Sequence, residues 1–277
     1  MSQETASNVG LPLPINGKTR LYAILGDPIA QVGSPGLFNP WFRAQGIEAL
    51  LFPVHVAPSH LPCVFSGLLN VQNFDGWVVT VPHKVAVMDL IDSVTPRAQA
   101  IGAVNAVRRL ADGKTEGDNF DGVGFARSLA SQGIEVKGKR VLILGCGGAG
   151  RAVAFATASE QPLQVNVEDI SQDSACGLTA MLTGAFPTLT VERGAGDISR
   201  FDIVVNCTTL GLKGDDPLPF DVASLNDGTL VVDIIPHSTT LLLEAAERRG
   251  LPIHRGKGML EAQVAAIGEF FGYPALN

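Results

Sequence analysis

The chain has 277 residues, of which 46% are hydrophobic and 17% charged, and its formal net charge is −7. A single hydrophobic core stops growing at about 250–300 residues, so we expect two domains. The acidic balance argues against nucleic acid or an anionic membrane as a partner, because both favour clustered lysine and arginine, and we expect a small-molecule partner instead.

Targeting and metal-binding signals are missing from the sequence. Met1–Thr5 has neither a basic region nor an apolar stretch, and no apolar run reaches the length of about 18 residues that spans a membrane, so we expect a cytoplasmic protein. The five histidines are scattered, and we expect none to be catalytic. The cysteines lie too far apart for a metal site, so we expect reduced thiols and no metal; they are Cys63, Cys146, Cys176 and Cys207.

Strand-length apolar stretches alternate with helical patterns along the chain, which is typical of α/β proteins with a largely parallel sheet. The first 18 or so residues, rich in Pro, Asn, Ser and Gly, are expected to form a loose lead-in. Asp121 is placed to cap one predicted helix. The first half is predicted to hold strands at 21–25, 49–56, 77–81 and 103–107 and helices at 36–45, 61–70, 85–91 and 122–131. The second half is predicted to hold strands at 141–144, 163–167, 202–206 and 230–234 and helices at 151–158, 240–249 and 259–271.

A glycine-rich turn, Gly145-Cys146-Gly147-Gly148-Ala149-Gly150, stands between a predicted strand and a predicted helix. In a dinucleotide fold the first glycine makes the tight turn, the second lets backbone N–H groups approach a diphosphate, and the third allows the helix to pack on the strand. The turn and its context therefore predict a dinucleotide site.

The predicted strand after this turn ends in Glu168-Asp169, where a dinucleotide fold places the acid that binds the ribose hydroxyls. An acid there repels a 2′-phosphate, and residues 170–173 offer no Arg or Lys to hold one. We therefore expect NAD as the favoured cofactor, with NADP possible. Alternatively, Asp169 only solvates the end of a strand. The loop 205–211, at the end of another strand, is expected to line the nicotinamide side.

Two further residues suggest proton transfer. Lys84 follows a predicted strand, and Asp121 stands at the junction with the second half. A lysine beside a carboxylate suits hydride-transfer chemistry, because the ammonium can donate a proton to a carbonyl oxygen while the carboxylate orients it. From spacing alone, a surface lysine and a helix cap are the alternative.

Ordered motifs along nearly the whole chain resemble the shikimate dehydrogenase family. The matching segments are Gly26–Ala30 with Ser34-Pro35, Val79–Lys84, Ile101–Asn105, Gly117–Gly122, the glycine turn 145–150, Val205–Thr208 and Gly256–Gln263. The resemblance implies reversible reduction of 3-dehydroshikimate to shikimate by a nicotinamide cofactor. It also implies an N-terminal α/β substrate domain (1–121 and 256–277), to which the C-terminal helix returns, and a doubly wound Rossmann cofactor domain (122–255).

The resemblance assigns the expected site residues. Lys84 and Asp121 would be the catalytic pair. The substrate would be contacted by Ser34, Thr80, Asn105, Phe120 and Gln263. The cofactor would be contacted by Gly145, Cys146, Gly147, Gly148, Ala149, Gly150, Asp169, Cys207, Thr208, Ile234, Gly256 and Met259.

Departures from the family pattern fall in the substrate pocket. Val32 replaces the first of two carboxylate-binding serines, Val78 replaces an asparagine and Phe120 replaces a threonine, while Pro236 and a shortened loop stand where the family has a tyrosine. We expect either weak use of shikimate or preference for a related, less polar ring, with shikimate first and quinate next. The residues 169–171 also depart from the Asn-Arg-Thr sequence of NADP-using members.

Two other functions stay open at this point. One is a dinucleotide-binding regulator or sensor that kept the fold without turnover, and the other is a Rossmann-like methyltransferase. The sequence is compatible with a monomer or a homodimer.

Overall fold

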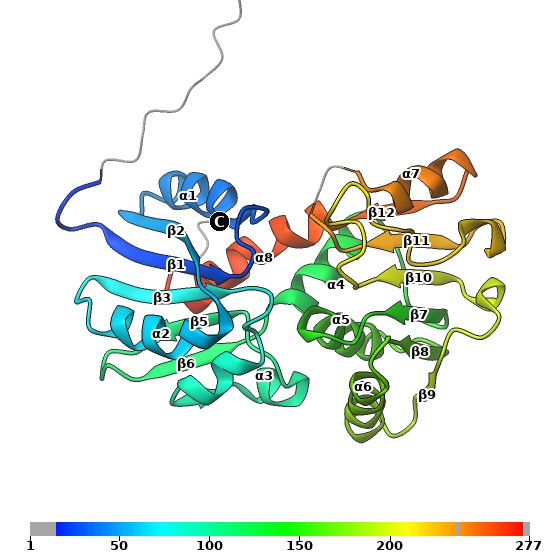
Figure 1. Ribbon diagram of the computed structural model, residues 1–277, viewed down its shortest axis with the longest axis horizontal. Helices are drawn as coiled ribbons and strands as arrows, with labels where there is room; N and C mark the ends of the chain where they lie inside the picture. The colour runs from blue at the N-terminus through cyan, green and yellow to red at the C-terminus, as the bar shows by residue number, and fades with distance from the viewer. Residues whose placement is uncertain (1–14, 237–238, 274–277) are drawn as a thin grey trace, which may run out of the picture.

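The computed structural model describes residues 15–236 and 239–273, which form two lobes, each built around a six-stranded sheet (Figure 1). In the first sheet the strand order is β2-β1-β3-β5-β6-β4. Strands β1, β2 and β3 are parallel, whereas β5 is antiparallel to both β3 and β6. The strand bounds are Arg20–Gly26 (β1), Ala49–His55 (β2), Phe74–Val79 (β3), Ser93–Val94 (β4), Ala106–Arg109 (β5) and Thr115–Asp118 (β6).

Helices cover both faces of the first sheet. One face packs against α1 (Ser34–Ala44) and the C-terminal helix α8 (Gly256–Phe270), through Phe38 and Ile267 among others. The other face packs against α2 (Leu61–Leu69), whose Phe65 stacks on Trp77 with ring centroids 4.3 Å apart.

The second sheet is parallel throughout and has the strand order β12-β11-β10-β7-β8-β9. This is the order of a doubly wound dinucleotide-binding sheet, in which ligands bind beyond the carboxyl ends of the strands where the order reverses, here between β7 and β10. The strand bounds are Arg140–Leu144 (β7), Gln164–Glu168 (β8), Thr190–Arg193 (β9), Ile203–Asn206 (β10), Leu230–Asp233 (β11) and Ile253–Arg255 (β12). The helices α5 (Gly148–Ser159) and α6 (Gln172–Ala185) cover one face, and α7 (Leu241–Arg248) covers the other.

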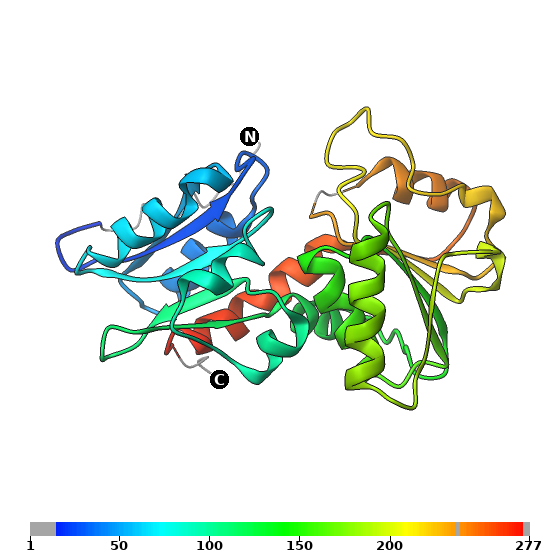
Figure 2. The ribbon, with the colours of Figure 1, turned by 60° about the horizontal axis from the view of Figure 1, so that its bottom comes forward.

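Two helices lie between the lobes and pack against each other: α4 (Asp121–Ser131) and α8 (Figure 2). Their close approach requires Gly124, because a Cβ there would lie 2.4 Å from the backbone oxygen of Met259 and 2.5 Å from Cγ of Gln263. Since α8 follows β12 and then packs on the first sheet, the predicted return of the C-terminal helix is confirmed, as is the α/β fold with a second lobe of Rossmann type.

Several local predictions need correction. The first sheet is parallel at β2-β1-β3 and at β4-β6, but β5 runs antiparallel to both of its neighbours, because a hairpin turning at Gly113 (φ +85°) joins β5 to β6. The stretch 85–91 is a short 3-10 helix, Ala86–Leu90, and the strand expected at 103–107 begins only at Ala106. Asp121 is the first residue of α4 and does not cap it, since Phe120 occupies the cap position. The pattern also missed α3 (Pro96–Ile101), α6, β4, β6, β9 and β12.

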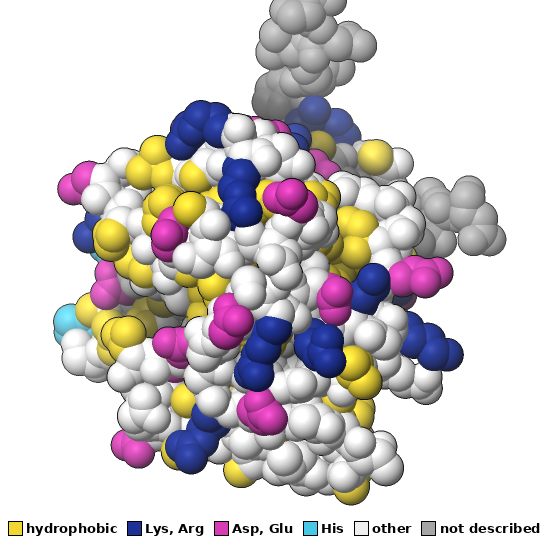
Figure 3. All heavy atoms as spheres, turned by 90° about the vertical axis from the view of Figure 1, so that its right-hand side faces the viewer, with side chains coloured by type: hydrophobic (Ala, Val, Ile, Leu, Met, Phe, Trp, Pro, Cys, Tyr) yellow, Lys and Arg dark blue, Asp and Glu magenta, His cyan; other side chains and the backbone are white. Residues whose placement is uncertain are grey.

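The lead-in, the membrane signal, the cysteines and the surface charge were also considered in the sequence. Most of the expected lead-in lies outside the described residues. In the part of the chain that the structure describes, no helix is both long enough and apolar enough to cross a bilayer. The four cysteines form no disulfide. Figure 3 shows basic and acidic side chains interspersed over the outer face of the second lobe, without a continuous basic patch on that face. The domain boundaries at 121/122 and 255/256 stay a prediction.

Candidate active site

A buried ion pair lies where the two lobes meet. Lys84 stands in the segment that follows β3, and its Nζ lies 2.5 Å from Oδ2 of Asp121 at the start of α4. Only 9% of Lys84 and 4% of Asp121 are exposed to solvent. The sequence alone allowed a surface lysine and a helix cap, and the structure excludes both interpretations.

Two amide side chains extend this pair into a hydrogen-bonded network. Asn105 Nδ2 donates to Oδ1 of Asp121 (2.9 Å) and to Oε1 of Gln263 on α8 (3.2 Å). Asn105 and Gln263 are themselves buried. Four residues from distant parts of the chain, at 84, 105, 121 and 263, thus meet in one polar cluster.

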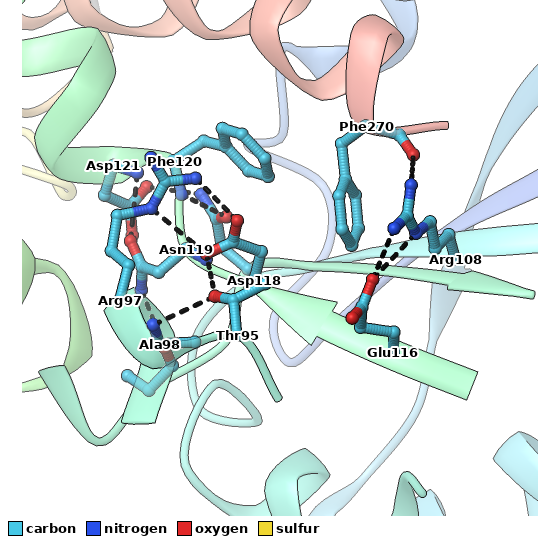
Figure 4. Close-up of polar contacts among 12 residues, drawn as sticks. Thr95, Arg97, Ala98, Arg108, Glu116, Asp118, Asn119, Phe120, Asp121 and Phe270 are labelled. Atoms are coloured by element: carbon cyan, nitrogen blue, oxygen red, sulfur yellow. Dashed lines mark hydrogen bonds and ion pairs between the residues drawn. The ribbon is translucent and has the colours of Figure 1, made fainter. Parts of the chain in front are cut away.

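The segment before Asp121 is held by a second ion pair, which the sequence did not indicate. The carboxylate of Asp118 accepts hydrogen bonds from Arg97 (Nη2 to Oδ2, 2.6 Å) and Thr95 (Oγ1 to Oδ1, 2.6 Å), as Figure 4 shows. Asn119 then accepts a hydrogen bond from the backbone N–H of Asp121 (3.0 Å). The motif Gly117-Asp118-Asn119 marks this segment in the sequence. Nothing in the sequence identifies Arg97 as the ion-pair partner of Asp118.

Two candidate substrate contacts carry uncommitted hydroxyl groups. Ser34 is the first residue of α1 and is buried, and Thr80 follows β3 and is half-buried. Within the described residues neither hydroxyl makes a hydrogen bond. Both can therefore bind an oxygen of a ligand without breaking an internal contact.

The residues that depart from the family pattern gather in one apolar cluster. Val78 and Phe120 are buried members of the cluster between the first sheet and α8, and Val32 packs against it. The Phe120 ring lies against Phe270, with centroids 5.4 Å apart, and under the guanidinium of Arg97. The side chain expected to contact substrate thus fills the core beneath the site. His237 and Ser238, in the loop after Pro236, lie outside the described residues.

The glycine turn has the geometry of a diphosphate-binding loop. Gly145 has φ +93°, and a Cβ on Gly150 would lie 1.9 Å from the Gly145 oxygen, so both positions require glycine. Gly147 precedes α5, and a Cβ added to it would have no other atom within 4 Å. The N-terminus of α5 therefore offers free backbone N–H groups and a positive dipole end to an anion.

The other candidate cofactor residues lie along the same edge of the second sheet. The Cys207 backbone N–H donates to Leu144 O (2.7 Å) beside Gly145, and Thr208 Oγ1 donates to Oδ1 of Asn206 (2.7 Å). A Cβ on Gly256, near Met259 in α8, would lie 2.3 Å from the carbonyl carbon of Ile234. These residues thus follow strands β10, β11 and β12 at the carboxyl edge of the second sheet.

The two cysteines of this region are poor nucleophiles. Burial raises the pKa of the Cys146 thiol to about 12, and burial raises the pKa of Cys207 well above its ordinary value. Because the thiolate is the reactive form, both side chains act as small apolar groups near neutral pH.

Comparison with known proteins gives a consistent answer. The family model of the shikimate dehydrogenase substrate binding domain matches residues 24–107. A shikimate dehydrogenase (NADP(+)) of Lysinibacillus sphaericus (strain C3-41) is 35% identical over 92% of this chain and 94% of its own length. Shikimate dehydrogenase of Aquifex aeolicus has a TM-score of 0.86 and 33% identity, covering 95% of this chain and 96% of that one. Shikimate 5-dehydrogenase of Thermus thermophilus, solved with NADP(H) and shikimate, has a TM-score of 0.81 and 29% identity, covering 92% of this chain and 95% of that one.

The prediction that NAD is the favoured cofactor is wrong. The Lysinibacillus relative is named an NADP(+) enzyme and the Thermus structure holds NADP(H), so the comparisons point to NADP. The structure explains why Asp169 misled. Its Oδ2 accepts the Cys146 backbone N–H (2.6 Å) and its Oδ1 accepts that of Ser171 (2.8 Å), so the carboxylate holds the loop together. These contacts give Asp169 a structural role in the loop.

The comparisons give no support to a non-catalytic regulator or to a methyltransferase. Sequence motifs, sheet order and relatives agree over more than nine-tenths of the chain. The chain therefore belongs to the shikimate dehydrogenase family and is an oxidoreductase of that type.

Proposed function

We propose that the protein transfers a hydride reversibly between NADP(H) and a hydroxylated, carboxylated six-membered ring, with Lys84 and Asp121 as the catalytic pair. The observation that carries the proposal is the buried ion pair, with Nζ 2.5 Å from Oδ2, joined through Asn105 to Gln263. The substrate domain would comprise 1–121 and 256–277, and the cofactor domain 122–255.

In the proposed reaction Lys84 transfers the proton and Asp121 positions Lys84. When bound, the nicotinamide supplies the hydride for ketone reduction and accepts it for alcohol oxidation. The Lys84 ammonium donates a proton to the carbonyl oxygen as the alcohol forms, and the amine takes that proton back in the reverse direction. Asp121 holds Nζ in place, and Asn105 fixes the second oxygen of that carboxylate. Ser34, Thr80, Asn105 and Gln263 would bind the ring substituents.

The cofactor would lie along the carboxyl edge of the second sheet. The glycine turn fits a diphosphate, because Gly147 leaves open space in front of α5 and Gly145 and Gly150 have no room for a side chain. Cys207, Thr208 and Ile234 would line the nicotinamide side, with Gly256 and Met259 of α8. NADP(H) is proposed because relatives that match this chain along its length carry it in their names.

Shikimate is the first candidate substrate and quinate the second. Positions 32, 78 and 120 carry apolar side chains where the family pattern has polar ones, and this loss of polar groups favours a less polar ring. A hydrogen bond to a charged group contributes about 1.5–3 kcal/mol, so two missing contacts weaken shikimate binding by about 100-fold or more.

The test is an absorbance assay of NADP(H) turnover with shikimate, quinate and simpler hydroxycyclohexene carboxylates. We expect turnover of at least one ring, and a loss of at least about 100-fold from Lys84→Ala. Asp121→Asn should also reduce turnover. Lys114→Ala, at an exposed lysine of the β5–β6 hairpin, is the matched control. Unchanged turnover in both active-site variants would refute the proposed mechanism. A monomeric or homodimeric state and a cytoplasmic location stay predictions.

A further inference from the structure

The alkyl stem of Lys84 lies against the first turn of α5. A Cβ on Gly148, the first residue of that helix, would lie 3.1 Å from Lys84 Cβ and 3.3 Å from Lys84 Cδ. The neighbouring Gly147 faces open space, with nothing within 4 Å of such a Cβ. Two adjacent glycines of one turn therefore have different surroundings. Gly147 faces the side where the cofactor diphosphate would lie, and Gly148 faces the lysine of the opposite lobe.

Lys84 has little freedom to move away from Gly148. The Val104 backbone N–H donates to the Lys84 carbonyl oxygen (2.8 Å). The segment just before Val104 is itself attached to α5, because Ile101 packs on Ala152 and accepts a 2.6 Å hydrogen bond from Arg151 Nε. A group added to Gly148 would therefore displace the lysine stem, or separate the two lobes at this point.

We propose that Gly148 is a positioning residue for Lys84. Its missing side chain lets the stem lie on α5, so that Nζ reaches Asp121 at the edge of the cofactor loop. The helix that receives the cofactor diphosphate thereby also sets the position of the proton donor. This inference rests on the proposed catalytic role of Lys84.

The Gly148→Ala variant tests the inference. The contact of 3.1 Å must lengthen by a few tenths of an ångström to reach an ordinary distance. A misplacement of about 1 Å at a reacting group lowers rate by about 100-fold, so we expect kcat to fall about tenfold. The KM for NADP(H) should change less than about threefold. Helix propensity favours alanine over glycine, whereas the displaced lysine stem opposes it, so the two effects act in opposite directions on the melting temperature.

Two matched glycine-to-alanine variants separate this effect from others. Gly184→Ala, at an exposed position of α6 with nothing within 4 Å, should leave the kinetics unchanged. Gly147→Ala places its methyl group on the cofactor side, so it should mainly raise the KM for NADP(H). The split between kcat and KM thus distinguishes the two neighbours of one turn.

A double-mutant cycle completes the test. In the Lys84→Ala background there is no ammonium to misplace, so adding Gly148→Ala should lower kcat less than twofold. Wild-type kcat in Gly148→Ala would overturn the inference, as would a pure rise in cofactor KM or a full tenfold fall in the Lys84→Ala background. Activity of Lys84→Ala alone reports separately on the proposed function, since only a large loss there supports a catalytic lysine.

Discussion

Removing one charge of the Lys84–Asp121 pair should destabilise the fold as well as stop the reaction. Asp121→Asn keeps the shape of the side chain but leaves a buried ammonium without its carboxylate. Breaking a buried ion pair in this way costs about 3–5 kcal/mol. Because Lys84 keeps 9% of its surface exposed, we expect the lower end, about 3 kcal/mol. For a chain of this size that corresponds to a fall in melting temperature of about 6–12 °C.

The partner substitution Lys84→Met should have a similar effect, because it leaves a buried carboxylate while keeping the alkyl stem against Gly148. The double variant contains neither charge, so its loss should be smaller than the sum of the two single losses by at least about 1.5 kcal/mol. Thermal unfolding followed by circular dichroism measures all four proteins. Single variants that melt within about 2 °C of the parent, or strictly additive losses, would refute this account of the pair.

Three other predictions follow from the site and its surroundings. Val32→Ser returns a hydroxyl near Ser34 and should lower the KM for shikimate about 10- to 100-fold; an unchanged KM in initial-rate assays would show that the apolar cluster does not face the substrate. Asp169→Asn weakens the backbone hydrogen bonds of the glycine loop and should raise the KM for NADP(H) several-fold, whereas a tenfold fall would mean that Asp169 repels the 2′-phosphate. Burial lowers the pKa of His254 below its ordinary value of 6.5, so the folded state favours the neutral ring. The stability that this neutral ring contributes is present above about pH 6.5 and is lost as pH falls through the folded-state pKa. Between about pH 7 and 5, His254→Gln should therefore lose less thermal stability than the parent; equal losses would contradict this.

The central strands of the second lobe were predictable because they are buried on both faces. The four strands predicted there, at 141–144, 163–167, 202–206 and 230–234, all coincide with observed strands, because each is a short apolar run. The first lobe breaks the pattern at β5 and β6, where Arg108 and Glu116 pair across a hairpin and the strands carry few apolar residues. The helix α6 was not predicted, because Gly177 and Gly184 interrupt its apolar sequence pattern and only Ala175, Leu178 and Leu182 are buried.

Motifs placed the candidate site residues in the right regions but could not decide between structural and chemical roles. Asp121 has the sequence environment of a helix cap, and only the contacts of its two oxygens with Lys84 and Asn105 show that it does something else. Asp169 presents the opposite case. It has the sequence position of a ribose acceptor, yet both of its oxygens accept hydrogen bonds from the backbone. The role of each aspartate is determined by the hydrogen-bond partners of its carboxylate. Those partners cannot be read from the spacing of residues in the sequence.

The role of a glycine is also hard to predict from sequence, because it depends on which side chain fills the space that a Cβ would occupy. A Cβ on Gly26 would lie 2.5 Å from Thr80 Cγ2, and one on Gly124 would lie 2.5 Å from Gln263 Cγ. With Gly148 against Lys84, three glycines thus lie against three side chains assigned to substrate binding or catalysis. The family resemblance attributes Gly148 to the cofactor. The side chain that fills the space next to it comes from the other lobe and belongs to the proposed proton donor, so a role in phosphate binding and a role in positioning the lysine can reside in adjacent residues of one turn.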